Sequence, residues 1–322
     1  MKKYIIYILL FFCLSLHGQA LFPLLSKTSE SYTWTAKAST KNWIDIDMSA
    51  NGKYQTAVAY DDSIYISSNY GKTWNAVDSG FLWRAVCVDS TGQHQYAIAI
   101  DAYIHKSDDY GVTWVEVSKI KKWVNIATSA TGQYVTATSS TSGLSDSIYV
   151  SSDYGDTWTG ILPLNYSWYY VSLSNAGNYQ LVSTIHFING YGYAYISADY
   201  GNNWSQKKYG RGFNVTMSAT GQYAYLGSIY GDSIYVSLDY GDTWVGKEPV
   251  KAWRKITTSY DGAIVIGVVE SDSIYVSLDY GDTWTGKDSP RSWRSVAISK
   301  NGKYQTAIVY NGQIYINNIY GN

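Results

Sequence analysis

Carboxylates recur at one position of a repeated eight-residue segment, and this pattern allows two chemical interpretations. The segment reads Ser-x-Asp-Tyr-Gly-x-Thr-Trp, with identical copies at 237–244 and 277–284. Looser copies occupy 67–74, 107–114, 151–158 and 197–204. Repeated carboxylates could bind calcium or act as general acids and bases. Catalysis does not need the same carboxylate in nearly every copy, so the recurrence favours a structural role.

The structural role that fits these residue types is a tight turn between two strands. A carboxylate such as Asp239 can accept hydrogen bonds from backbone N–H groups of its own turn. Gly241 permits a backbone conformation that other residues resist, and the Trp can bury its ring in the following strand. We call these segments repeat turns. Their predicted structural residues are Asp109, Asp153, Asp199, Asp239, Asp279, Trp74, Trp114, Trp158, Trp204, Trp244 and Trp284, with Trp34 as a displaced copy.

Other residues with catalytic or metal-binding chemistry form no recognisable motif. The four histidines, His17, His94, His105 and His186, lack metal-ligand spacing. The glycines lie in turns, without the strand–loop–helix context of a nucleotide site. The sequence therefore predicts no metal and no cofactor. A carboxylate pair suited to glycoside hydrolysis could lie among the loop aspartates, but nothing in the sequence singles one out.

Candidate binding residues lie where the repeats depart from their pattern. The third and fourth units carry extra residues at 139–146 and 186–193, and the fifth has Gly212 at its expected opening Trp, followed by Phe213. Aromatic faces suit a sugar or peptide, and cations suit an anionic partner. The predicted ligand-binding residues are His186, Phe187, Tyr191, Tyr193, Lys207, Lys208, Arg211 and Phe213. Neutral loop variation and seven weak, equivalent grooves between units are the alternatives.

A second series of tryptophans shows what must position these residues. Each unit opens with a Trp, at positions 43, 83, 123, 168, 253 and 293, and the one long interval hides a unit near Gly212. Seven units of about 40 residues have the period of propeller blades. Alternating apolar and polar residues predict four short strands, A to D, in each unit. The B–C and D–A loops then emerge on one face, the loop face, and the repeat turns on the other, the turn face.

The two ends of the chain complete each other. The last unit stops inside its repeat turn at Asn322, and the missing Thr-Trp appears as Thr33-Trp34 near the start. The strand at 33–36 should therefore complete the blade that Trp293 begins and close the ring. The predicted fold is all-β, a single seven-bladed β-propeller of four-stranded antiparallel blades.

The repeat turn resembles the Asp-box of BNR-type β-propellers, and the resemblance covers about 33–322. Sialidases of this group are similar, but their F/Y-R-I-P motif and Tyr–Glu nucleophile pair are absent here. Seven-bladed photosystem II assembly factors also resemble this chain, and that resemblance implies a non-enzymatic role. Their basic patch is only loosely echoed by the Lys and Arg residues of the D–A loops.

The first twenty residues predict export. Lys2 and Lys3 precede an apolar run that ends in small residues near Ala20, which is the pattern of a signal peptide. The expected organisation is a signal peptide at 1–20, a lead-in at 21–31 and the propeller at 32–322, with no membrane span after cleavage. A retained N-terminal anchor is the alternative. The chain carries 24 Lys and Arg against 25 Asp and Glu, so no nucleic-acid partner is expected.

The sequence as a whole favours an exported binding module, secreted or at the periplasm or cell surface. Its partner would be a glycan or a protein, recognised on the loop face of blades three to five. A sialidase-like glycoside hydrolase and a structural surface or assembly-factor protein are the alternatives.

Overall fold

The structure, a computed structural model, describes residues 32–140, 146–164, 167–186 and 189–318. Residues Tyr32–Asn322 form one compact unit. The predicted signal peptide and lead-in lie outside the described residues. Every regular element within the described ranges is a β-strand.

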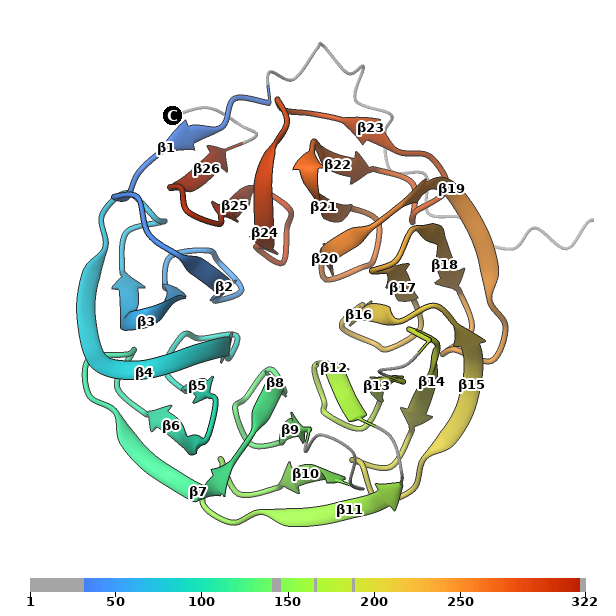
Figure 1. Cartoon of the computed structure of the whole chain (residues 1–322), viewed down its shortest axis with the longest axis horizontal. Coiled ribbons are helices and arrows are strands. Elements are labelled where there is room, and N and C mark those ends of the chain that lie inside the picture. Colours follow the sequence, from blue (N-terminus) through green and yellow to red (C-terminus); the bar gives the residue numbers. More distant parts are fainter. Residues whose placement is uncertain (1–31, 141–145, 165–166, 187–188, 319–322) are drawn as a thin grey trace, which may run out of the picture. The chain divides into compact units, whose positions relative to one another are not determined.

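The strands follow one another as successive blades around an axis (Figure 1). The first three blades contain β2 (Trp43–Met48), β3 (Gln55–Ser67), β4 (Asn75–Val88), β5 (Gln95–Ala99), β6 (Ala102–Ser107), β7 (Val115–Lys121), β8 (Trp123–Thr128), β9 (Val135–Ser139), β10 (Asp146–Ser151) and β11 (Thr159–Leu164). Here β3 spans strands B and C of blade one, and β4 runs from strand D of blade one into strand A of blade two.

The remaining blades repeat the pattern. Blades four and five contain β12 (Ser167–Leu173), β13 (Gln180–Ile185), β14 (Gly192–Ser197), β15 (Ser205–Gly210), β16 (Phe213–Met217), β17 (Ala224–Ser228), β18 (Asp232–Ser237) and β19 (Val245–Lys251). Blades six and seven contain β20 (Trp253–Thr258), β21 (Val265–Asp272), β22 (Ile274–Ser277), β23 (Thr285–Gly286), β24 (Arg291–Ile298), β25 (Tyr304–Val309), β26 (Ile314–Asn318) and β1 (Thr35–Ala36).

The prediction of a seven-bladed propeller closed by its N-terminal strand is confirmed. Each blade is antiparallel, with strand A nearest the axis (Figure 1). Strand β1 pairs with β26, the third strand of blade seven, through Thr35 opposite Ile316 and Ala36 opposite Tyr315. Trp34 packs against Trp293, with ring centroids 6.2 Å apart. The N-terminal segment therefore supplies both the outer strand of blade seven and the Trp that its repeat turn lacks.

A belt of backbone hydrogen bonds provides a second closure. One residue in each A–B turn donates its N–H to the equivalent carbonyl of the next blade, at 2.8–3.0 Å. The belt runs through Ala50, Ser90, Ala130, Asn175, Ala219, Tyr260 and Lys300, and it returns from Lys300 to Ala50. Each backbone hydrogen bond of this kind contributes roughly 0.5–1.5 kcal/mol. Because the belt includes every blade, the ring does not depend on the two-residue pairing of β1 alone.

The blades pack through a repeated aromatic unit at the start of strand A. In blade six, Trp253 is fully buried and meets Tyr275 edge-on at 5.7 Å, and the Lys251 ammonium lies 5.3 Å from the centre of that Tyr ring. Equivalent cation–Tyr pairs are Lys41–Tyr65, Lys121–Tyr149, Lys208–Tyr235 and Arg291–Tyr315. Blade two differs, because Phe81 and Trp83 surround His105 there. The cations of the D–A loops therefore belong largely to the scaffold.

In the repeat turns, the carboxylates are engaged by their own turn. Asp239 accepts hydrogen bonds from Ser237 Oγ at 2.8 Å, from Thr243 N at 2.9 Å and from Thr243 Oγ1 at 2.6 Å. The bonds from Thr243 lower the pKa of Asp239. Trp244 Nε1 donates to the carbonyl of Gly241 at 2.9 Å. These contacts hold the carboxylate in the turn and direct the Trp ring toward the blade.

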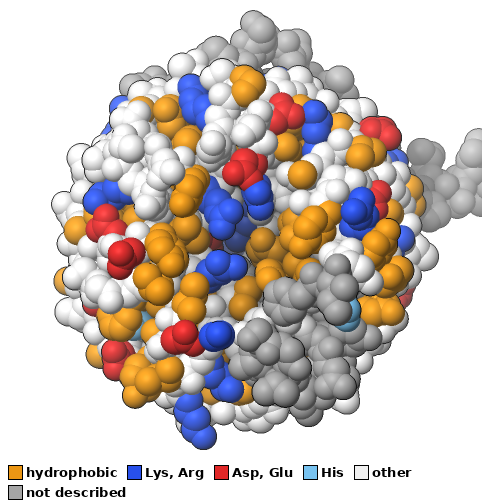
Figure 2. Space-filling model, in the orientation of Figure 1, with side chains coloured by type: hydrophobic (Ala, Val, Ile, Leu, Met, Phe, Trp, Pro, Cys, Tyr) orange, Lys and Arg blue, Asp and Glu red, His pale blue; other side chains and the backbone are white. Residues whose placement is uncertain are grey.

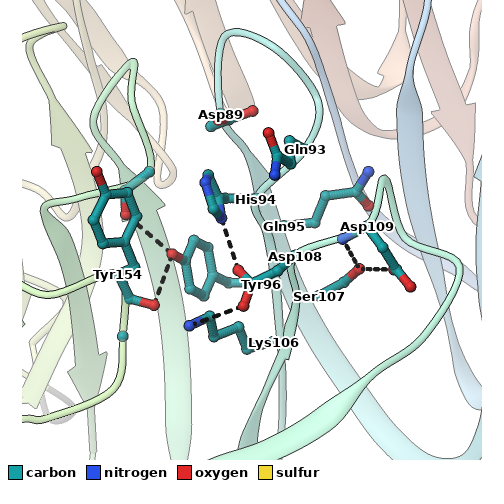
Figure 3. Close-up of polar contacts among 12 residues, drawn as sticks. Asp89, Gln93, His94, Gln95, Tyr96, Lys106, Ser107, Asp108, Asp109 and Tyr154 are labelled. Carbon is teal, nitrogen blue, oxygen red and sulfur yellow. Dashed lines mark hydrogen bonds and ion pairs between the residues drawn. The ribbon is translucent and has the colours of Figure 1, made fainter.

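The turn face joins neighbouring blades through aromatic pairs. The Tyr of each described repeat turn packs on an aromatic residue in the A–B turn of the preceding blade. Tyr240 of blade five packs on Tyr179 of blade four in this way, with ring centroids 4.7 Å apart. The junction of blades two and three has charged groups in addition to its His94–Tyr154 pair (Figure 3). There His94 contacts Asp108 at 2.7 Å, and Lys106 lies 3.1 Å from Asp108 and 2.7 Å from Asp156. Lys106 is 5% exposed, at a position where the other blades have Ile or Val.

Candidate functional site on the loop face

Three arginines meet at the axis because each follows the opening residue of strand A. Arg84, Arg254 and Arg294 come directly after Trp83, Trp253 and Trp293. The strand register shifts by one residue after each of these tryptophans. A bulge of this kind changes the direction of one side chain, which no longer follows the alternation of side chains between the two faces of the strand. All three guanidinium groups consequently line the same cavity at the mouth of the axis.

The cavity at this mouth, which we call the axial cavity, is small and lined mainly by polar groups. Its lining includes Arg84, Arg254, Lys255, Arg294, Asp45, Asn125, Tyr169, Tyr170 and Ser295. Its volume of about 50 Å³ leaves room for only a few water-sized groups. Figure 2 shows Lys and Arg side chains gathered around the hollow at the centre of this face. The space fits a carboxylate or phosphate better than a sugar ring.

The charges in the axial cavity are not balanced. Arg254 pairs with Glu270, and Lys255 lies 3.5 Å from Asp45. Neither Arg84 nor Arg294 has an ion-pair partner among the described residues. Burial and the neighbouring charge of Arg294 lower the pKa of Arg254. An anion placed here would relieve this repulsion, so the geometry favours an anionic ligand group.

In the wall of the cavity and farther along the axis, acidic and amide side chains accept hydrogen bonds from the inner edges of the A strands. Asp45 accepts from Ser295 Oγ at 2.7 Å and from Val86 N at 3.2 Å, and Asp47 accepts from Val88 N at 2.8 Å. Burial raises the pKa of Asp47 to about 6. Asn125 and Asn214 accept from backbone N–H groups of the next blade in the same way. These groups support the axis, and they leave the arginines as the exposed chemistry of its mouth.

Part of the sequence-predicted site is assembled on blade four. Tyr191 and Tyr209 stack with ring centroids 5.3 Å apart, and Tyr193 lies 5.0 Å from Tyr209. The Arg211 guanidinium lies 5.7 Å from the centre of the Tyr191 ring. His186 is exposed at the same loop, where its backbone N–H donates to the carbonyl of Tyr191. The three tyrosines and Arg211 form what we call the tyrosine patch.

The structure removes other predicted residues from this patch. Phe213 is fully buried and meets Tyr235 edge-on at 6.0 Å, so it occupies the position of the opening Trp and is unavailable to a surface ligand. Lys208 lies over Tyr235 at 4.2 Å, as part of the repeated cation–Tyr unit. Lys207 Nζ instead pairs with Asp242 of the blade-five repeat turn at 2.7 Å. Phe187 lies outside the described residues.

Sequence reasoning missed several residues of this face. None of the predicted ligand-binding residues was among Arg84, Arg254, Arg294, Lys255, Tyr169 and Tyr170. The available signal was the position after each opening Trp, where three of the seven units have Arg. Tyr209 was also missed, although it is 53% exposed.

Tyr230 lies next to the tyrosine patch. A Cβ atom at Gly190 or Gly212 would lie within 3.1 Å of the Tyr230 ring. The absence of a side chain at both positions therefore lets the ring pack against the backbone. Tyr230 lies in the B–C loop of blade five, between β17 and β18. It is 47% exposed. Tyr230 therefore adds an exposed aromatic ring beside the tyrosine patch.

The described ranges contain neither a metal-binding cluster nor a membrane-spanning helix. No group of three His, Cys, Asp or Glu side chains there is arranged to hold a metal ion. The described strands and loops also include no helix of the length and apolarity needed to cross a membrane.

The comparisons with known proteins support the fold. No family model matches the sequence, and no curated protein matches it. A structure of YCF48 from Cyanidioschyzon merolae is similar, with a TM-score of 0.66 and 12% identity over 88% of this chain and 98% of that one. A structure of YCF48 bound to D1 peptide is similar to the same degree, over 90% of this chain and 97% of that one. At this identity, the likeness concerns the β-propeller architecture.

Proposed function

We propose that this chain is an exported binding propeller that recognises a protein partner on its loop face. The axial cavity would accept one carboxylate of the partner, and the tyrosine patch would contact the adjoining segment. The observation that carries the proposal is the convergence of three guanidinium groups on a small cavity, two of them without a carboxylate partner in the described chain.

Cavity size and surface chemistry favour a peptide over a glycan at this face. A space of about 50 Å³ accepts an acidic group but not a pyranose ring, and Arg matches a carboxylate with two parallel hydrogen bonds. Exposed tyrosines give contact area with little loss of side-chain entropy. A similar propeller, YCF48, has been seen bound to a peptide, which shows that this architecture can hold one.

The proposal is tested with a library of acidic and neutral peptides of equal length, screened by fluorescence polarisation. We expect acidic peptides to bind, with affinity that falls as salt rises. Arg84→Gln with Arg294→Gln should weaken the best peptide by about tenfold or more. The matched control is Arg291→Gln, because Arg291 already pairs with Asp288 and lies over Tyr315. It should leave the peptide affinity nearly unchanged.

Two outcomes would contradict the proposal. Equal binding of acidic and neutral peptides that survives the double substitution would exclude the arginines as the recognition element. Turnover of fluorogenic glycosides that disappears when one loop-face carboxylate is changed would instead support the hydrolase alternative.

A further inference from the structure

A groove on the turn side of blades four and five is a second, independent candidate site. It lies between the two repeat turns and has a volume of about 470 Å³, within the range of about 300–1,000 Å³ typical of small-molecule sites. Its aromatic walls are Trp204, Tyr179 and Tyr240, and its polar walls include Asp199, Lys207 and Asp242. None of these side chains lines the axial cavity.

Two small residues line the groove where blade five has larger ones. Blade four has Ala198 in its repeat turn and Ser205 after Trp204, and both line the groove. The equivalent positions of blade five hold Leu238 and Val245, which are 55% and 57% exposed. Leucine and valine at these positions would extend into the space that Ala198 and Ser205 leave free. The two small side chains distinguish this junction from blade five, whereas blade three, with Ser152 and Thr159, also carries small residues at these positions.

The polar groups of the groove offer donors and acceptors side by side. Lys207 Nζ contacts Asp242 Oδ1 at 2.7 Å across the junction, and the Asp242 side chain is 69% exposed. Asp199 is fixed by Ser197 Oγ at 2.8 Å and by Asn203 Nδ2 at 2.6 Å. An ammonium beside a carboxylate can bind two adjacent hydroxyl groups. The ammonium donates a hydrogen bond to one hydroxyl, and the carboxylate accepts one from the other. Two carboxylates against one ammonium disfavour an acidic ligand.

We propose that this groove binds a neutral sugar ring, as one hexose unit of a glycan. The C–H faces of a pyranose would pack on the aromatic walls, and its hydroxyls would bind the Lys207–Asp242 pair. Tyr179 and Tyr240 are held together as a tilted pair at 4.7 Å, so the wall is preformed. This proposal does not depend on the peptide-binding role of the loop face.

The test is saturation-transfer NMR on the full folded chain with the methyl β-glycosides of glucose, galactose and N-acetylglucosamine. We expect transfer from at least one of them, with a Kd of about 1 mM. Ala198→Leu with Ser205→Val copies the residues of blade five and should reduce that transfer at least tenfold. The matched control, Ser152→Leu with Thr159→Val, makes the same change in blade three and should keep it.

Three results would overturn the proposal. These are no transfer from any of the three glycosides at about 10 mM, equal loss in both paired variants, and unchanged transfer in the blade-four variant. Melting curves of both variants are recorded first, and only variants that melt like the parent are used, so that a loss of transfer is not due to unfolding. Peptide binding on the loop face is measured on the same samples and should not change in either variant.

Discussion

The turn face and the loop face of this propeller are built from the same seven repeats but differ in regularity. On the turn face, the belt of backbone hydrogen bonds and the aromatic pairs repeat from blade to blade. On the loop face, the residue after the opening aromatic differs among blades, and three arginines converge with Tyr169 and Tyr170. The difference indicates that the turn face closes the ring, which leaves the loop face free to vary.

The largest expected effect is a loss of stability that distinguishes the scaffold residue Phe213 from the surface residue Arg211. Phe213→Ala should lower the free energy of unfolding by about 3–5 kcal/mol, because a fully buried ring is removed from the core. Arg211→Ala should change it by no more than about 0.5 kcal/mol, because Arg211 is exposed. Urea unfolding measures both. A small effect at Phe213 would return that residue to the list of ligand contacts.

A second substitution, at Asp47, tests how a buried charge at the propeller axis affects stability. Burial raises the folded-state pKa of Asp47 from 3.8 to about 6, so the folded state holds this proton more tightly than the unfolded chain does. The contribution of Asp47 therefore favours folding below pH 3.8 and is lost as pH rises to about 6. Asp47→Asn, which can still accept from Val88 N, should stabilise the protein by about 2–3 kcal/mol at neutral pH.

The same variant should show almost no stabilisation below pH 3.8, where Asp47 is protonated in both states. Thermal melts across this pH range provide the measurement. A constant difference at all pH values would mean that Asn changes the packing of the axis and not its charge.

A third prediction concerns blade two, where His105 takes the place of the strand-C Tyr. His105 is buried between Phe81 and Trp83 and contacts Asp78 at 2.8 Å, and burial lowers its pKa. Because the unfolded chain binds this proton more readily, stability should be lost as pH falls below the unfolded pKa of about 6.5. His105→Tyr, the residue of the other six blades, should reduce this loss.

The measurement for His105 is the difference in melting temperature between about pH 7.5 and about pH 5. Tyr275→Phe is the control, because it alters the same position of blade six without removing a titratable histidine, and it should keep the full acid sensitivity. An unchanged difference in the His105 variant would assign the sensitivity to other groups.

The sequence was sufficient for the ring because its period is carried by large, invariant side chains. The opening tryptophans set the number of blades, and Thr33-Trp34 identified the closing strand. The sequence pattern assigned Gly212 to the opening position of the fifth unit and Phe213 to the binding residues. The spacing of 40 residues between Phe213 and Trp253, which most units share, indicated that Phe213 holds the opening position. Lys208 was misjudged because cations over the strand-C Tyr are a shared feature, visible only once the blades are packed.

The axial cavity could not be predicted in the same way. Arg84 and Arg294 are separated by most of the chain, and they meet only because seven equivalent positions converge on one axis. Within any single unit, the residue after the opening aromatic looks like neutral variation. Comparing that position across all units would have placed three arginines at the axis, but the choice of ligand charge also needs the partners of each guanidinium.

The smallest expected effect tests the polar junction of the turn face. Lys106 is buried beside Asp108 and Asp156, where the other blades have Ile or Val. Replacing a buried ion by a well-packed hydrophobic residue is often neutral or stabilising, and both carboxylates are exposed enough to remain hydrated. Lys106→Ile should therefore shift the free energy of unfolding by no more than about 1 kcal/mol, toward greater stability.

The reverse change provides the control for Lys106. Ile196→Lys introduces a cation at the equivalent position of blade four, where Ala198 stands in place of Asp108 and Asp242 is already paired with Lys207. That buried charge lacks a free carboxylate, so it should cost about 3 kcal/mol or more. If Lys106→Ile proves as damaging as Ile196→Lys, the ion pairs of Figure 3 are essential to closure, and the turn face is less uniform than its hydrogen-bond belt indicates.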